Sequence, residues 1–367
     1  MAPPAPSPPS SGDAPADVDG VATRAARERL QRVLSELAKS PRFALGHQDT
    51  TAYGVGWSGD ADRSDLASLC GSHAAVRGWD LFGIERDAPS NGDGVDFERM
   101  RALILDAHRR GAVNTVSWHV DNPVSGKNAW DRTRAVHAIL PGQRLHTAFL
   151  GYLDRVARFM RSLRAAGGEL VPIIFRPFHE HTGSWFWWGG SNTNAADFVS
   201  LWRFTVDYLR NEQGLDNLLI AFSPDGGQLR RAADYFYRYP GDAYVDVFGV
   251  DQYYARDSRS LVRAVEIAVR AAEARGKIPA LTEFGARDGL NSKGIGPRWM
   301  VDDFLRPLEQ SAIGSRIAYA LAWRNASTKH CFMPYPGYAG AELFRGTFCA
   351  DDRVLLEKDI SSLLSSP

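Results

Sequence analysis

Residues 170–180 read LVPIIFRPFHE, a largely apolar run that ends in the polar side chains Arg176, His179 and Glu180. An apolar run of this length is typical of a strand buried on both faces, as in a parallel sheet. Residues 278–286, IPALTEFGA, repeat the arrangement, with Glu283 directly after the run Ile278–Thr282. Polar groups at the ends of buried strands favour a fold that gathers those ends on one face.

Six more runs of β-like sequence follow the same pattern: Phe43–His47, Ala75–Trp79, Ala112–Trp118, Leu218–Phe222, Val245–Val250 and Arg316–Ala322. Stretches with helical spacing of apolar residues lie between them, such as 149–166, 195–210 and 260–275. This alternation of strands and helices predicts an α/β protein, and at this length a single (β/α)8 TIM barrel. No glycine fingerprint follows the first strand, which argues against an open dinucleotide-binding sheet.

The composition excludes several classes of protein. The 367 residues carry 43 basic and 43 acidic side chains, so no charge excess favours nucleic acid or an anionic membrane surface. No apolar run approaches the roughly 18–20 residues that a membrane-spanning helix needs. Three cysteines are too few for a disulfide scaffold and lack the spacing of a structural zinc site. The 10 Trp, 12 Tyr and 18 Phe residues favour an enzyme that handles sugars.

The first 20 residues, MAPPAPSPPSSGDAPADVDG, are rich in Pro, Ala and Ser. They contain too few large apolar groups to form a core, so we expect residues 1–20 to be disordered and residues 21–367 to form one domain. Such a tract is typical of the segment after an export signal or lipid anchor. We therefore expect a secreted, periplasmic or cell-surface protein in which Met1 replaces the signal.

Two glutamates at strand ends are candidates for catalysis. Cleavage of a glycosidic bond needs one carboxyl group to protonate the leaving oxygen and a second to meet the positive charge at the anomeric carbon. Glu180 and Glu283 supply such a pair on the carboxyl-end face. The alternative for either residue is an ordinary ion pair with an arginine at a strand end.

Aromatic and imidazole side chains surround Glu180. Four aromatic residues, Trp185–Trp188, lie in a loop between glycines, and we expect at least one ring to face a sugar while one or two pack beneath the loop. His179 and His181 flank the glutamate and raise the alternative of a metal-dependent hydrolase. The other strand-end groups are chiefly Trp, Tyr, Arg and Glu, a poor set of metal ligands, so we expect no metal and no cofactor.

The motifs at the strand ends resemble glycoside hydrolase family 26, the β-mannanase family within the clan of (β/α)8 retaining glycosidases. The matching segments are FALGHQDTTAYG at 43–54, VSWHVDNP at 116–123, FRPFHEHTGSWFWWG at 175–189, VDQYY at 250–254, LTEFGA at 281–286 and ALAWRN at 320–325. They occur in the order expected for the family and cover the whole predicted barrel.

The resemblance implies a role for each of these residues. Glu180 would be the general acid/base, Glu283 the nucleophile, and Tyr253 a hydrogen-bond donor to that nucleophile. Arg176 or Arg324 could also stabilise the charge of Glu283. The further residues that the resemblance assigns to substrate binding are His119, Trp323 and Arg324 on the non-reducing side of the cleaved bond, Trp185 on the leaving-group side, and His179 before the acid.

The resemblance implies a retaining β-1,4-mannanase that cleaves internal or chain-end bonds of mannan, galactomannan, glucomannan or manno-oligosaccharides by double displacement. Nothing in the sequence demands a partner chain, so we expect a monomer. The alternatives are a mixed-linkage β-glucanase or β-1,3-xylanase of the same family, and a carbohydrate-binding protein without activity. The long segment 121–146 is expected to build distal sugar sites, with an ordinary surface loop as the alternative. In an exported protein, Cys331 and Cys349 are candidates for a disulfide, and Cys70 is expected to be buried in a helix.

Overall fold

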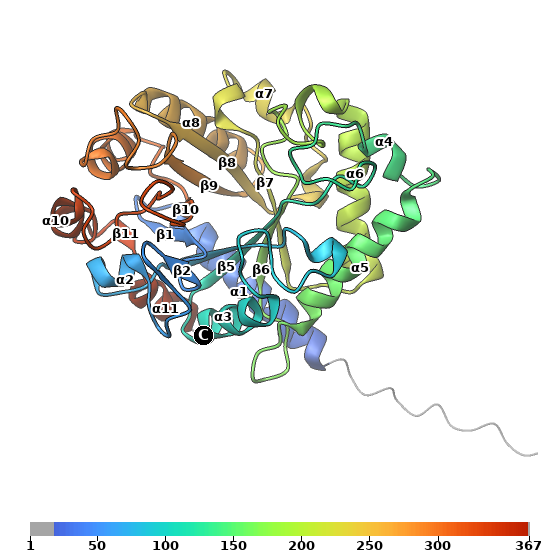
Figure 1. Cartoon of the computed structure of the whole chain (residues 1–367), viewed down its shortest axis with the longest axis horizontal. Coiled ribbons are helices and arrows are strands. Elements are labelled where there is room, and N and C mark those ends of the chain that lie inside the picture. The colour runs from blue at the N-terminus through green and yellow to red at the C-terminus, as the bar shows by residue number, and fades with distance from the viewer. Residues whose placement is uncertain (1–17, 366–367) are drawn as a thin grey trace, which may run out of the picture.

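The structure, a computed structural model, describes residues 18–365. Eight parallel strands follow one another around a closed barrel (Figure 1). They are β1 (Phe43–Gln48), β4 (Val76–Asp80), β5 (Val113–Trp118), β6 (Ile173–Pro177), β7 (Leu218–Phe222), β8 (Val247–Tyr254), β9 (Ile278–Ala286) and β10 (Tyr319–Ala322). The barrel closes where β1 pairs with β10, from Ala44 opposite Tyr319 to His47 opposite Ala322. The predicted (β/α)8 barrel and its eight strands are confirmed.

Three further strands have only two residues each. The hairpin β2 (Tyr53–Gly54) and β3 (Trp57–Ser58) follows β1, and β11 (Val354–Leu355) pairs in parallel with the start of β1. The sequence analysis missed all three, because a two-residue strand is too short to show a hydrophobic period.

Helices precede, connect and follow the barrel strands. They are α1 (Val18–Leu37), α2 (Asp65–Cys70), α3 (Phe97–Arg109), α4 (Val136–Ile139), α5 (His146–Ser162), α6 (Ala195–Asp207), α7 (Ala232–Phe236), α8 (Ser258–Glu273), α9 (Arg306–Gln310), α10 (Ala341–Leu343) and α11 (Glu357–Ser365). Side-chain caps fix where several begin: Asp96 accepts from the Arg99 amide at α3, and Asn194 accepts from the Asp197 amide at α6. Such caps satisfy amides that the first helical turn leaves unpaired.

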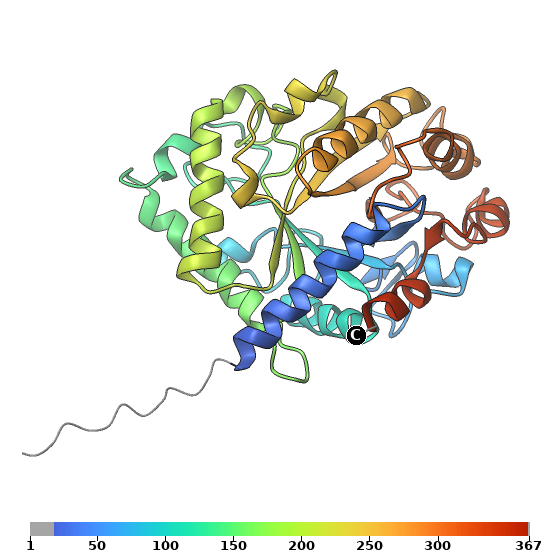
Figure 2. The same cartoon turned by 180° about the vertical axis from the view of Figure 1, so that it is seen from behind.

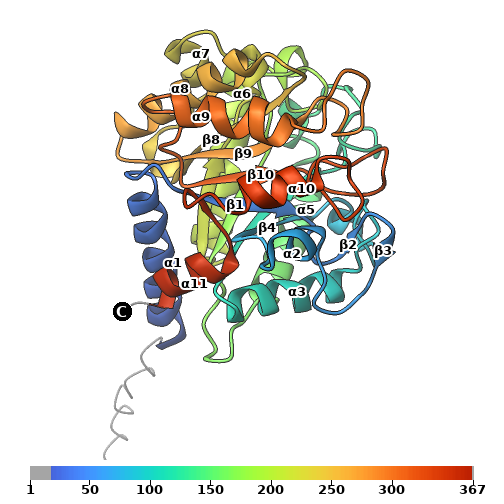
Figure 3. The ribbon, with the colours of Figure 1, turned by 90° about the vertical axis from the view of Figure 1, so that its left-hand side faces the viewer.

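Helix α1 closes the amino-terminal end of the barrel. Figure 2, the view from behind, shows it crossing in front of the strands, and Figure 3 places it opposite the β2–β3 hairpin. Its buried side chains Leu30 and Leu34 pack with Ile174 and Leu219 of the strands. Most of the predicted disordered segment, residues 1–17, lies outside the described residues, and α1 begins at Val18 within the predicted segment. Between residues 18 and 365 no helix is both long and apolar enough to cross a membrane.

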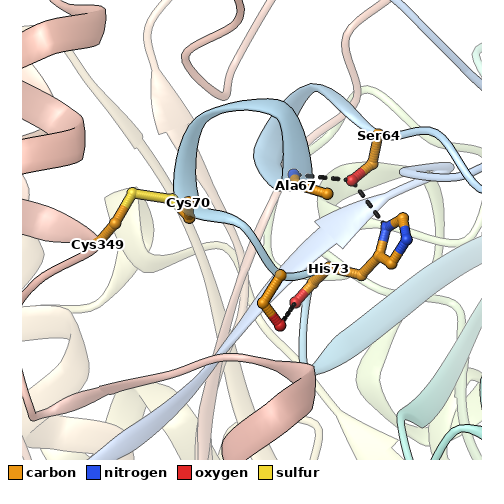
Figure 4. The surroundings of a disulfide bond; sticks show 6 residues. Ser64, Ala67, Cys70, His73 and Cys349 are labelled. Atoms are coloured by element: carbon orange, nitrogen blue, oxygen red, sulfur yellow. Dashed lines mark hydrogen bonds between the residues drawn. A yellow bond between two sulfur atoms is a disulfide. The ribbon is translucent and has the colours of Figure 1, made fainter.

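The disulfide joins Cys70 to Cys349, residues 279 positions apart in the sequence (Figure 4). The predicted Cys331–Cys349 pair is therefore wrong, and Cys331 is a buried free thiol. Cys70 does lie in a helix, as expected, but it is half-buried and not buried, because it ends α2 and bonds to the segment that follows β10. At the other end of α2, Ser64 caps the helix by accepting from the Ala67 amide. Spacing along the sequence could not reveal a pair that the barrel closure brings together.

Candidate active site

The turn after β6 presents Glu180 to the carboxyl-end face of the barrel. Phe178 and Glu180 have φ angles of 47° and 50°, in the left-handed region that side chains with a Cβ rarely adopt. The Glu180 amide donates to the Ser223 carbonyl at 2.7 Å, which ties this turn to the end of β7. Backbone strain of this kind persists where the surrounding structure imposes it, and it clusters at functional sites.

Glu283 lies within β9 and accepts hydrogen bonds from one donor on the adjacent strand β8 and one on β6, across the barrel. The Tyr253 hydroxyl donates to Glu283 Oε1 at 2.6 Å, which is the contact that the family resemblance predicts. Arg176 Nη2 donates to Glu283 Oε2 at 2.5 Å. Of the two arginines considered from the sequence, Arg176 is thus the one that contacts this carboxylate. Both contacts fix the orientation of the Glu283 carboxylate, and Arg176 places a positive charge beside it.

A buried layer beneath Glu283 holds Arg176 in place. Arg176 Nη1 donates to Asp251 Oδ2 at 2.6 Å, and the Thr282 hydroxyl donates to Asp251 Oδ1 at 2.6 Å. Burial raises the pKa of Asp251 to about 7 even though Arg176 lowers it. The arginine therefore bridges two carboxyl groups, one buried and one facing the cleft.

Glu180 lies in surroundings that favour its neutral form. Burial, followed by the negative charges of Glu283 and Asp251, raises the pKa of Glu180 well above its usual range. The Trp185 indole donates to Glu180 Oε2 at 2.6 Å, which opposes the shift without reversing it. A carboxyl group that keeps its proton near neutral pH can act as a general acid, while Glu283 has cationic and hydroxyl partners that suit an anion.

Aromatic rings and imidazoles form one wall of the cleft. His119 Nδ1 lies 2.7 Å from Asp80 Oδ2, and although burial lowers the pKa of His119, Asp80 raises it overall. The Trp130 ring stacks on His119 with centroids 5.2 Å apart and an interplanar angle of 14°. Trp130 comes from the long segment after β5, so that segment does contribute to the cleft, as expected.

The cleft has a volume of about 480 Å³ and brings together almost all of the predicted residues. Those in its lining are Glu180, Glu283, His119, His179, Trp185, Tyr253 and Trp323. Arg324 belongs to a neighbouring cluster instead, where Nη2 pairs with Asp93 at 2.8 Å and Nη1 donates to the Tyr53 hydroxyl at 3.5 Å.

The four aromatic residues after Glu180 divide as expected. Trp185 and Phe186 both line the cleft, whereas Trp187 and Trp188 are fully buried. The two histidines that flank Glu180 also separate: His179 lines the cleft, but His181 is buried between the rings of Phe198 and Phe222. They face different surroundings and do not form a shared ligand pair.

Loops after β7 and β9 add residues that the sequence analysis did not select. They are Asp225, Gly227 and Gln228 after β7 and Arg287 after β9. Asp225 follows the run 218–222 by only a few positions, so the strand-end rule could have included it. Arg287 lies beyond the glutamate of its strand, and no pattern in the sequence distinguishes it from a surface arginine.

Comparison with known proteins finds a matching family model and relatives in sequence and in structure. The sequence model of glycosyl hydrolase family 26 matches residues 18–290. A mannan endo-1,4-β-mannosidase from Bifidobacterium adolescentis is 33% identical over 88% of this chain, which spans only 34% of that relative's length. Among solved structures, a β-mannanase from Bacteroides ovatus is 36% identical with a TM-score of 0.87, covering 93% of this chain and 97% of its own. A modular endo-β-1,4-mannanase from Cellulomonas fimi is 33% identical with a TM-score of 0.84, covering 93% of this chain and 78% of its own.

Proposed function

The chain belongs to glycosyl hydrolase family 26, and from this premise we propose that it is a retaining β-1,4-mannanase. The observation that carries the proposal is the contrast between the two glutamates. Glu180 has its pKa raised by burial and by other carboxylates, while Glu283 accepts hydrogen bonds from Arg176 and Tyr253. Environments that separate two carboxyl groups into an acid and an anion are what glycoside cleavage requires.

In the proposed reaction, Glu283 attacks the anomeric carbon while Glu180 transfers its proton to the leaving glycosidic oxygen. The bond to the leaving sugar breaks and a covalent glycosyl–Glu283 intermediate forms. Glu180, now ionised, takes a proton from water, and the resulting hydroxide equivalent displaces Glu283 with net retention. Tyr253 and Arg176 are positioning residues that release part of their hold on Glu283 as its charge is lost.

Mannan is the proposed substrate because relatives that match this chain over most of its length are named as β-mannanases. The ring of Trp323 and the imidazoles of His119 and His179 surround the place where the sugar would be attacked. An aromatic face packs against the C–H face of a pyranose, and neutral or charged imidazoles bond its hydroxyl groups.

The test is a time course on mannohexaose, with products separated by chromatography and the anomer of the first product read by NMR. We expect hydrolysis with the β-anomer formed first. Glu180→Ala and Glu283→Ala should each lower kcat by about a thousandfold or more. Glu98→Ala, at an exposed position of α3, should leave kcat unchanged.

Each contrary outcome has a distinct meaning. An α-anomer as first product would contradict retention, and near-full activity in either glutamate variant would contradict its assigned role. Cleavage of mixed-linkage glucan or β-1,3-xylan but not of mannohexaose by the wild type would support glycosidase activity and contradict mannan as the substrate. Binding without hydrolysis of any of the three would favour a binding protein.

We also propose that the protein works outside the cytoplasm, as a monomer. The Cys70–Cys349 disulfide supports the first part, because such bonds persist in oxidising compartments. Fractionation of the native cells should recover the activity outside the cytoplasm, and light scattering should give the mass of one chain.

A further inference from the structure

A second hollow adjoins the active-site cleft, with a volume of about 630 Å³. The loop after β6 contributes Thr182, Ser184 and Ser191 to its lining, and the region around α7 contributes Tyr237. Gln228 lines both this hollow and the cleft. A chain bound in the cleft can therefore continue past Gln228 into this second hollow.

The hollow presents an open aromatic ring. Among residues 18–365, the large aromatic side chains that are well exposed are Trp130 at 49% and Tyr237 at 65%. Trp130 lines the cleft, and Tyr237 lines the second hollow. The two exposed rings lie in adjoining hollows, where each offers a flat apolar surface to a ligand that spans both.

Tyr237 is backed by a cation that has a fixed position. The guanidinium carbon of Arg238 lies over the Tyr237 ring at 5.9 Å from its centroid. Arg238 itself is 2% exposed and donates to the carbonyl oxygens of Trp188 at 3.2 Å and Thr193 at 2.6 Å. The ring of Tyr237 thus lies beside a buried, hydrogen-bonded side chain, while Tyr237 itself is 65% exposed. A stacking surface that is already immobilised loses little entropy when a ligand binds.

The position of the hollow in the barrel indicates which part of a glycan it would meet. Its loop after β6 is the same loop that carries Glu180 and Trp185, the groups expected at the leaving oxygen. His119 and Trp323, the groups expected at the sugar on the non-reducing side of the cleaved bond, come from the ends of β5 and β10. The hollow therefore extends the cleft on the leaving-group side. Hydroxyl and amide side chains near Tyr237 suit the hydroxyl groups of a sugar.

We propose that this hollow is a further sugar-binding subsite, in which Tyr237 stacks on a mannose unit of the leaving-group chain beyond the one at Trp185. The inference rests on the proposed function and adds to it a preference for substrates long enough to reach Tyr237. The subsite takes no part in bond cleavage, so its contribution is confined to substrates that have two or more sugars on the leaving side.

The test compares mannohexaose with 4-nitrophenyl β-mannobioside, whose small leaving group cannot reach the hollow. Tyr237→Ala should lower kcat/KM on mannohexaose about three- to tenfold, the loss expected for one aromatic stacking contact. Activity on the aryl substrate should be unchanged. Tyr237→Phe, the matched control, keeps the ring and should resemble the wild type on both substrates.

A second variant acts by filling the hollow. Ser191→Trp, at an exposed position in its lining, should reduce cleavage of mannohexaose and spare the aryl substrate. An unchanged kcat/KM on mannohexaose in Tyr237→Ala and Ser191→Trp would overturn the subsite, and so would equal losses on the two substrates, which would indicate a structural role. A wild-type protein inactive on both substrates would instead contradict the proposed function, and this inference with it.

Discussion

Asp49 is a carboxylic acid buried directly after β1, at the edge of the catalytic face. The Tyr53 hydroxyl donates to Asp49 Oδ2 at 2.7 Å, and its other oxygen has no partner among the described residues. Burial, together with the nearby negative charge of Asp93, raises the pKa of Asp49 to about 8, although Tyr53 and Arg324 oppose the shift. At neutral pH the folded protein therefore holds a proton here that the unfolded chain has released.

This difference predicts how stability changes with pH. Because the folded pKa lies above the unfolded value, the stabilising proton is fully bound in acid and is lost as the pH rises towards 8. Asp49→Asn keeps a side chain of the same shape and removes the titration. Between pH 6 and pH 9 its free energy of unfolding should fall by about 2–3 kcal/mol less than that of the wild type, because about two pH units separate pH 6 from the folded pKa.

The measurement is urea unfolding at both pH values. Asp352→Asn, at an exposed position, is the control and should follow the wild type. Equal losses in Asp49→Asn and in the wild type would show that Asp49 releases its proton in the folded state as readily as in the unfolded one.

Single residues were predictable where the strand pattern singled them out. Glu180 and Glu283 each follow a buried apolar strand, and the cleft gathers both. The sequence left Arg176 and Arg324 as equal partners for Glu283, because both end strands and only the barrel geometry separates them. The raised pKa of Asp49 could not be predicted from the sequence, because it depends on burial and on charges from distant segments.

Helix α2 is an element that depends on its anchors. Its six residues, Asp65–Cys70, are too few to be stable alone, since isolated helices below about 12 residues are marginal in water. Ser64 fixes its start, and the bond from Cys70 to Cys349 fixes its end to the segment after β10 (Figure 4).

Removing this bond should destabilise the fold without altering chemistry at the cleft. Cys70→Ser and Cys349→Ser should each lower the free energy of unfolding by about 2–4 kcal/mol, as for bonds that close long loops. Denaturant unfolding of either variant should match that of the wild type under reductant. Titration of the unfolded, non-reduced wild type should find one thiol, that of Cys331. Finding three thiols would mean that the bond does not form.

The sequence predicted those strands that are long enough to show a hydrophobic pattern. The eight barrel strands are long enough to read as apolar runs, whereas β2, β3 and β11 are two residues each. The cysteine pairing failed for a related reason: nearness along the chain favoured Cys331, while the partner of Cys349 is a residue brought close by barrel closure.

The two ends of the barrel have different roles: the amino-terminal end contributes to stability, and the carboxyl end carries the cleft. Helix α1 covers the amino-terminal end of the barrel, and the cleft opens at the other end. Leu34→Ala, at a fully buried position of α1, should lower the free energy of unfolding by about 2–5 kcal/mol. At 25 °C kcat should be unchanged, because the substitution leaves the carboxyl ends of the strands, which carry the site, in place.

The matched control is Val21→Ala in the same helix, where the side chain is 61% exposed and little should change. Thermal unfolding and activity on mannan are the two measurements. A loss of kcat in folded Leu34→Ala protein would contradict the separation of the two ends.

Closure of the barrel through β1 and β10 also determines which strand edges stay unpaired in a truncated chain. The strand synthesised first has to wait for the last barrel strand, at Tyr319–Ala322, before its second edge is paired. A chain that stops before Tyr319 would leave β1 and β9 with bare rows of amide and carbonyl groups, which are templates for joining neighbouring molecules. Such a fragment would aggregate instead of forming a smaller barrel, and during synthesis the protein passes through that vulnerable state each time it is made.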